Sequence, residues 1–104
     1  MEVQIFDNSL KQFIKSLDKP TKAKLIHVVE LLERFGHQLG LPHSRKISCG
    51  LFELRILGIQ QVRIFYAFHK GQAILLHGFV KKSSAIPCRE LRNARQKLRR
   101  LTSV

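Results

Sequence analysis

The chain has 104 residues, which suits one compact domain over residues 1–104 and leaves no room for a second core of useful size. Its residues are 44% hydrophobic and 25% charged, so the composition argues against a disordered chain and provides apolar material for a core. The 19 Lys and Arg residues against 7 Asp and Glu give a net charge of +12, which favours a polyanionic partner such as nucleic acid.

The first part of the chain predicts a short strand followed by two helices. Residues 2–6 alternate polar and apolar side chains, as a half-buried strand does. Asn8 or Ser9 can cap the first helix, and Pro20 suits the start of the second, which Gly36 ends. Because the break between them is short, the two helices should run antiparallel. Their apolar faces are formed by Leu10, Phe13, Ile14 and Leu17, and by Leu25, Val28, Val29, Leu32 and Phe35.

The second part predicts strands and a final helix. A loop at 40–44 leads to strand-like runs at 51–57, 61–68 and 73–80, which short turns join into an antiparallel meander. Pro87 opens the last helix. Its apolar stripe consists of Cys88, Leu91, Ala94, Leu98 and Leu101. The order β-α-α-β-β-β-α predicts an α+β fold in which the helices cover one face of a curved antiparallel sheet.

Positive charge increases toward the C-terminus. Residues 1–40 carry 6 positive and 5 negative side chains, residues 41–80 carry 5 and 1, and residues 81–104 carry 8 and 1. The last helix alone has Arg89, Arg92, Arg95, Lys97, Arg99 and Arg100. A charge run of this kind is usually a solvated surface. Its density here favours contact with phosphates or docking to an acidic partner.

The strands place further cations on one surface. Glu53 and Arg55 share a face of their strand, and Arg63 and Phe65 can share that same polar face from the next strand. Lys81 and Lys82 add two cations at its rim. Residues 41–104 hold only two acids against 13 cations, so an ion pair with Glu53 accounts for few of them. The pattern predicts an anion-binding site, and Phe65 is a candidate to stack on an exposed base.

The histidines and cysteines give no metal or redox pattern. No two His residues stand at i and i+4, and Cys49 and Cys88 lie far apart, so neither a metal site nor a disulfide is expected. His77 is a candidate for proton transfer if its strand turns it toward the basic surface. No apolar run is long enough to cross a bilayer, and the N-terminus lacks the pattern of a signal peptide, so we expect a cytoplasmic protein.

Several segments together resemble the phage-related HigB-like toxins of the RelE/ParE superfamily. The resemblance lies in residues 50–55, 62–68 and 76–82, followed by Pro87 and Glu90, and it spans nearly the whole chain. It implies a RelE-like fold and the toxin of a type II toxin–antitoxin pair. Such a toxin is an endoribonuclease that cuts mRNA in the ribosomal decoding site by attack of the RNA's 2′-hydroxyl. It uses no metal or other cofactor, and a cognate antitoxin, a small helix-turn-helix protein, silences it.

The resemblance also implies roles for individual residues. Arg55 is similar to the basic strand residue of RelE-type enzymes, Arg63 to their phosphate-stabilising arginine, and Lys82, with Lys81 beside it, to the cation after the last strand. Glu53 stands where RelE has lysine, and no tyrosine occurs near the start of the last helix, so Glu53 either acts as a base or holds Arg55 in place. The residues expected to contact RNA or the ribosome are Arg45, Lys46, Phe65, Arg89, Arg92, Arg95, Lys97 and Arg99.

Two other functions fit the same features. A ParE-like inhibitor of DNA gyrase uses the same scaffold, and fold alone does not select between the two activities. A small ribosomal or RNA-binding protein without catalysis would also account for the length and the charge of +12. A phage remnant with no activity is a third possibility.

Overall fold

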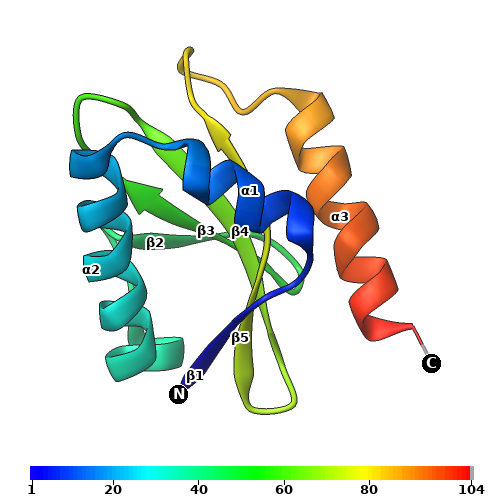
Figure 1. Ribbon diagram of the computed structural model, residues 1–104. Coiled ribbons are helices and arrows are strands. Elements are labelled where there is room, and N and C mark those ends of the chain that lie inside the picture. The colour runs from blue at the N-terminus through cyan, green and yellow to red at the C-terminus, as the bar shows by residue number, and fades with distance from the viewer. Residues whose placement is uncertain (104) are drawn as a thin grey trace.

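The computed structural model describes residues 1–103 as a five-stranded sheet with three α-helices (Figure 1). The strands are β1 (Glu2–Ile5), β2 (Ser44–Ser48), β3 (Leu51–Ile56), β4 (Val62–His69) and β5 (Gln72–Val80). The helices are α1 (Asn8–Ser16), α2 (Lys19–Phe35) and α3 (Cys88–Thr102), with a short 3-10 helix η1 (Gly36–Gln38) after α2. None of these helices is both long and apolar enough to span a membrane.

The sheet is mixed, whereas the sequence predicted a purely antiparallel one. Its strand order is β1-β5-β4-β3-β2, with β1 parallel to β5 and every other pair antiparallel. The two helices α1 and α2 carry the chain from the β1 edge to the β2 edge, from which the meander returns to β5 beside β1 (Figure 1). A crossover connection of this kind is what permits parallel neighbours.

Strand β2 is absent from the sequence prediction. Its five residues include one apolar side chain, Ile47, so they lack the alternation that marks a half-buried strand. They pair as an edge strand with β3. The hydroxyl of Ser44 forms a buried hydrogen bond of 2.6 Å with the hydroxyl of Tyr66, which ties β2 to the centre of the sheet.

Helices cover both faces of the sheet, which corrects the prediction that they lie on one face. Helices α1 and α2 pack on one face, where Leu10, Leu25 and Leu32 meet Ile64 and Tyr66 of β4. Helix α3 packs on the other face. Its neighbours there include Leu51, Phe65, Ala67, Ile74, Leu76 and Phe79. The reason is that β4 and β5 are apolar on both sides and so need a layer on each.

Local capping sets the helix ends. Asp7, and not Asn8 or Ser9, caps α1 by accepting a hydrogen bond of 3.0 Å from the backbone N–H of Leu10. Asp18 caps α2 in the same way, and Gly36 ends it in a backbone conformation with φ of 54°. The boundary at Gly36 and the start of α3 after Pro87 are as predicted.

Candidate functional site

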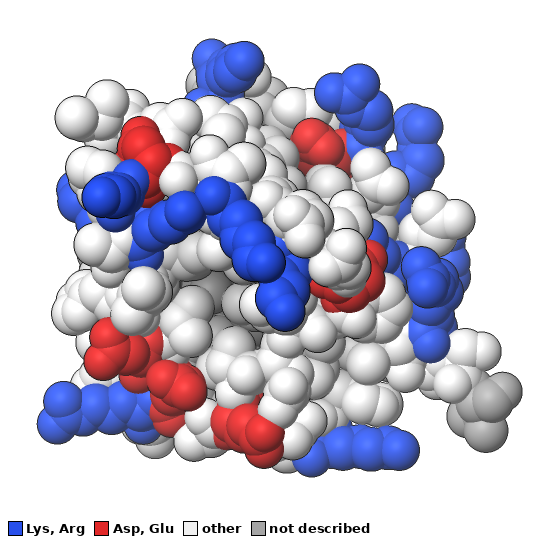
Figure 2. All heavy atoms as spheres, viewed as in Figure 1, with Lys and Arg blue, Asp and Glu red and all other residues white. Residues whose placement is uncertain are grey.

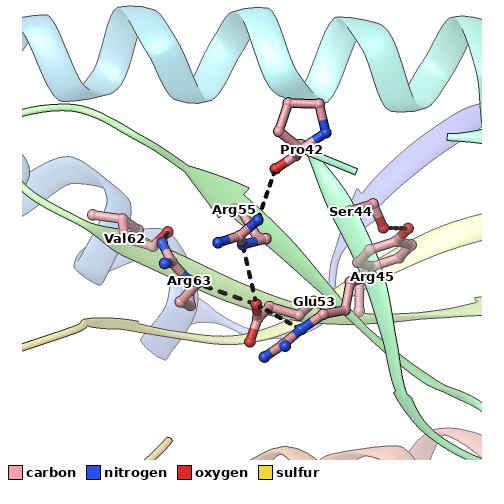
Figure 3. Close-up of polar contacts among 8 residues, drawn as sticks. Pro42, Ser44, Arg45, Glu53, Arg55, Val62 and Arg63 are labelled. Carbon is pink, nitrogen blue, oxygen red and sulfur yellow. Dashed lines mark hydrogen bonds and ion pairs between the residues drawn. The ribbon is translucent and has the colours of Figure 1, made fainter. Parts of the chain in front are cut away.

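The strand register brings charged side chains from three strands together on the face that carries α3. Arg55 of β3 lies opposite Arg63 of β4, and Glu53 of β3 lies opposite Arg45 of β2. Because alternate residues share a face, all four side chains project from the same side of the sheet. We call this group of Arg45, Glu53, Arg55 and Arg63 the arginine cluster (Figure 3).

Glu53 lies at the centre of the arginine cluster. Its side chain is 0% exposed, and the Nε atoms of Arg63, Arg45 and Arg55 lie 3.5, 3.6 and 3.7 Å from its Oε1 (Figure 3). These are ion pairs rather than hydrogen bonds, and both carboxylate oxygens lack a hydrogen-bond partner. A single buried carboxylate therefore faces three guanidinium groups and holds the Nε edge of each toward itself.

Arg63 is the most buried cation of the arginine cluster. Its side chain is 4% exposed, and Nη1 donates a hydrogen bond of 3.1 Å to the carbonyl oxygen of Val62. Burial lowers the pKa of the Arg63 guanidinium, Glu53 raises it, and Arg55 and Arg45 lower it, with a net lowering. An arginine starts so far above neutral pH that it keeps its proton. Arg63 is thus a fixed positive charge in a poorly hydrated place.

An open hollow of about 370 Å³ adjoins Arg63. We call it the lysine hollow; its lining residues are Gln61, Arg63, Lys81, Lys82, Ser83 and Ser84. The backbone N–H of Lys81 donates to the carbonyl oxygen of Gln61 at 2.6 Å, which fixes the lysine pair beside the start of β4. Arg63 therefore connects the two groups, since it pairs with Glu53 and also lines the hollow with Lys81 and Lys82.

The arginines of α3 form a separate basic surface. Arg92, Arg95 and Arg99 are exposed and line a shallow hollow along α3 with Cys88 and Leu91. We call these three the α3 arginine stripe. Figure 2 shows basic side chains along the side of the molecule where α3 lies, while acidic ones gather toward the end of α2. Arg89 points elsewhere and lines another hollow together with Lys82.

Comparison of the chain with known protein families finds a family whose model matches it. The family described as phage derived protein Gp49-like (DUF891) matches residues 12–99, which include the arginine cluster, the lysine hollow and the α3 arginine stripe. The chain belongs to this Gp49-like family. That family is related to RelE/HigB-type toxins, which agrees with the resemblance found in the sequence. No curated protein matches the chain.

Two residues of the Gp49-like chain lie apart from the site in which the sequence placed them. Phe65 shares the face of Arg63 as predicted, but it is fully buried beneath α3, with its ring centroid 5.7 Å from that of Phe79. The prediction that Phe65 stacks on an exposed base is therefore wrong. Alternation along a strand predicts which face of the sheet a side chain lies on, but it does not predict which helix covers that face. Lys46 is exposed on the other face of β2, since its partner in β3 is Phe52.

Two further candidates are tied to the core of the Gp49-like fold. Lys97 is 13% exposed, and its Nζ lies 3.0 Å from both the carbonyl oxygen of Leu76 and Oδ2 of Asp7. It joins α3 to β5 and to the cap of α1, so it is not a free surface cation. Nε2 of His77 lies 3.0 Å from Oε1 of Glu90 on α3, which pairs this histidine with a carboxylate and not with the arginine cluster.

Sequence reasoning missed some residues that the structure places at the site. Ser83 and Ser84 line the lysine hollow, and their only sequence signal is a polar loop directly after a strand that ends in two lysines. The sequence predicts Gln61 as an ordinary strand residue, but it lies just before β4 and lines the lysine hollow. Within residues 1–103 no three His, Cys, Asp or Glu side chains gather in the way that a metal site requires.

Proposed function

We propose that this Gp49-like protein is the toxin of a type II toxin–antitoxin pair and cuts mRNA on the ribosome as an endoribonuclease. The observation that carries the proposal is the arginine cluster, in which a buried Glu53 holds three guanidinium groups beside the lysine hollow. A preorganised group of cations stabilises the charge that develops on a phosphate during cleavage. The relation of the family to RelE/HigB-type toxins supports the same assignment.

In the proposed reaction the RNA phosphate lies in the lysine hollow against Arg63. The 2′-oxygen of the preceding ribose forms a bond to phosphorus and loses its proton to a solvent water molecule, while the bond to the 5′-oxygen breaks and that oxygen gains a proton. The products are a 2′,3′-cyclic phosphate and a 5′-hydroxyl. We propose that Arg63 and Arg55 neutralise the charge on the phosphate and that the ammonium group of Lys81 or Lys82, which line the same hollow as Arg63, protonates the leaving oxygen.

The burial of Glu53 supports the role of holding the arginines over the role of base. A base must come within hydrogen-bond reach of the proton that it removes. Glu53 is 0% exposed and enclosed by three arginines, so an RNA hydroxyl meets those arginines first. We therefore propose Glu53 as a positioning residue and Arg45, which is about half exposed, as a contact to the RNA backbone.

The proposed partners follow from the charge of the two basic surfaces. The α3 arginine stripe fits the phosphates of ribosomal RNA, which bind exposed arginines without sequence preference. The cognate antitoxin, which we expect to be a small helix-turn-helix protein, would need acidic side chains to cover the arginine cluster or the lysine hollow.

The test is to map the 5′ ends of mRNA by primer extension after brief induction of the protein in cells. We expect new cuts within translated frames for the unchanged protein and none for Arg63→Ala. The matched control is Arg34→Ala, which removes an exposed arginine of α2 outside the site and should keep the cuts. Growth arrest with intact mRNA would contradict the nuclease and favour gyrase inhibition. A folded Arg63→Ala protein that still cuts would contradict the assignment of Arg63.

A further inference from the structure

A second hollow adjoins the arginine cluster and takes no part in the cleavage steps described above. Its volume is about 220 Å³, and it lies between α2, the loop before β2 and the end of β3. We call it the histidine hollow; its lining residues are Lys24, His27, Val28, His43, Arg55 and Leu57. None of these six residues is acidic, so the hollow suits a neutral or anionic group.

Arg55 forms a wall between the arginine cluster and the histidine hollow. Its Nε lies 3.7 Å from Glu53, while Nη1 lies 3.5 Å from the carbonyl oxygen of Pro42, in the loop that carries His43. Figure 3 shows the Arg55 side chain between Glu53 and Pro42, with a helix in the colour of α2 across the top of the view, beyond Pro42. Arg55 thus belongs both to the arginine cluster and to the lining of the histidine hollow, so a nucleic-acid chain bound at Arg55 would lie at the edge of the hollow.

Two hydrogen bonds to backbone carbonyl oxygens fix the shape of the histidine hollow. The N–H of Arg55 donates to the carbonyl oxygen of His43 at 2.8 Å, which attaches the loop to β3. On the other side, Nζ of Lys24 donates to the carbonyl oxygen of Leu57 at 2.9 Å and ties α2 to the end of the same strand. Hydrogen bonds thus join β3 to the loop on one side of the hollow and to α2 on the other.

The lining fits a nucleobase. Val28 and Leu57 give an apolar wall, and Leu57 is 40% exposed although it is a large apolar side chain. The imidazole rings of His27 and His43 offer flat surfaces on which an unstacked base can lie. The hollow is smaller than the roughly 300–1,000 Å³ of pockets for drug-sized ligands, so it suits one ring system.

We propose that the histidine hollow binds the base of the nucleotide next to the phosphate at Arg63 and so sets which sequences are cut. This inference rests on the proposed function, because it names a substrate subsite of the same enzyme. His27 and His43 are then specificity-determining residues. They select the position of the cut and do not carry out the reaction.

The experiment is to map all mRNA 5′ ends in cells that express the unchanged protein, His27→Ala or His43→Ala, and to record the base on each side of every cut. The control is His69→Ala at the end of β4, outside the hollow. We expect both hollow variants to keep cutting while the preference for one flanking base falls about fivefold or more, as loss of a base–aromatic stack predicts. The control should keep the original preference.

The outcomes separate this inference from the proposed function. Cutting with an unchanged base preference in both hollow variants would overturn the inference and leave the nuclease standing. No cutting by the unchanged protein would overturn the nuclease and the inference together. His27 is exposed on α2, so its replacement keeps the test valid even if His43→Ala does not fold. Loss of all cutting by a folded His27→Ala protein would also overturn the inference, because a base-selecting hollow changes where RNA is cut.

Discussion

At the scale of residues, the site depends on one acid. Among residues 1–103, Glu53 is the one carboxylate that pairs with the three arginines of the cluster, and the burial of Glu53 and Arg63 removes water that would otherwise screen the charges there. The positive charges of Arg45, Arg55 and Arg63 can stay close together because Glu53 offsets part of their repulsion. The acid that gathers the arginine cluster thus also stabilises the fold around it.

Replacement of Glu53 by Gln should therefore destabilise the protein. The change leaves a buried guanidinium at Arg63 without its counter-charge, and removal of one partner from a buried ion pair costs about 3–5 kcal/mol. Urea denaturation measures the loss in the free energy of unfolding. The matched control is Glu30→Gln on the exposed surface of α2, which should change that free energy by no more than about 0.5 kcal/mol. Equal stability of the two variants would show that Glu53 does not hold the arginine cluster.

Three residues of the arginine cluster could be predicted from the sequence, but their burial could not, and neither could the place of Arg45 on the unpredicted strand β2. Alternation along a strand correctly placed Glu53, Arg55 and Arg63 on one face. The same rule placed Phe65 there too, and it is buried because α3 covers that end of the face. Lys97 looked like one more surface cation of an amphipathic helix, yet Asp7 and Leu76 bind it. What covers a side chain depends on tertiary packing, which alternation does not report.

At the scale of elements, α3 has two functions. Its apolar side closes one core of the sheet through Ala94, and the α3 arginine stripe lies next to that side, beside Cys88 and Leu91. Lys97 joins α3 to α1 through Asp7: burial would raise the pKa of this carboxyl, but hydrogen bonds from Leu10 and Lys97 hold it below its usual value. The stripe is therefore presented from a helix that is fixed to the rest of the molecule.

Neutralising the stripe should weaken docking to ribosomes and leave folding intact. In Arg92→Ala/Arg95→Ala/Arg99→Ala, three exposed charges that can contact phosphates are lost. We expect the slope of log affinity for purified ribosomes against log salt concentration to become shallower by about 2 to 3. The control removes three exposed lysines, at positions 11, 15 and 19, and so matches the change in net charge. An equal change of slope in the two triple variants would show that net charge alone, and not the stripe, governs docking.

The elements themselves were predicted with differing success, for physical reasons. The helices and the strands β3, β4 and β5 carry strong apolar patterns, and their predicted and observed ranges agree within one or two residues. Strand β2 has a single apolar residue and forms because β3 offers it an edge. The prediction that α3 packs on the same face as the other helices is wrong. An apolar stripe indicates that a helix packs on a core, but it does not indicate which face of the sheet supplies that core.

At the scale of the whole molecule, the two layers of helices leave the site open. Helix α3 covers one end of its face of the sheet, over Leu51, Phe65 and Phe79, and the arginine cluster lies on the same face. The basic half of the chain, residues 41–104, supplies both that cluster and the α3 arginine stripe. Under the proposed function, a single polyanion would contact both Arg63 and the exposed α3 arginine stripe on one protein.

The parallel pairing of β1 with β5 is the feature of the whole molecule that the sequence did not reveal. Alternation in residues 2–6 predicts a strand but carries no information about its partner or direction. The pairing places β5 between β1 and β4. The antiparallel register of β5 with β4 sets Val80 opposite Val62, so the two lysines that follow Val80 lie beside Arg63 and form the lysine hollow there.

The most direct test of the account uses purified protein, programmed ribosomes and an mRNA with a single 2′-deoxy nucleotide at the mapped cut position. We predict that the all-ribose mRNA is cut to a 2′,3′-cyclic phosphate and a 5′-hydroxyl, and that the 2′-deoxy substitution abolishes cutting at that position alone. Cutting that persists at the 2′-deoxy position, or an all-ribose mRNA that stays intact on the ribosome, would contradict the proposed attack by the 2′-hydroxyl.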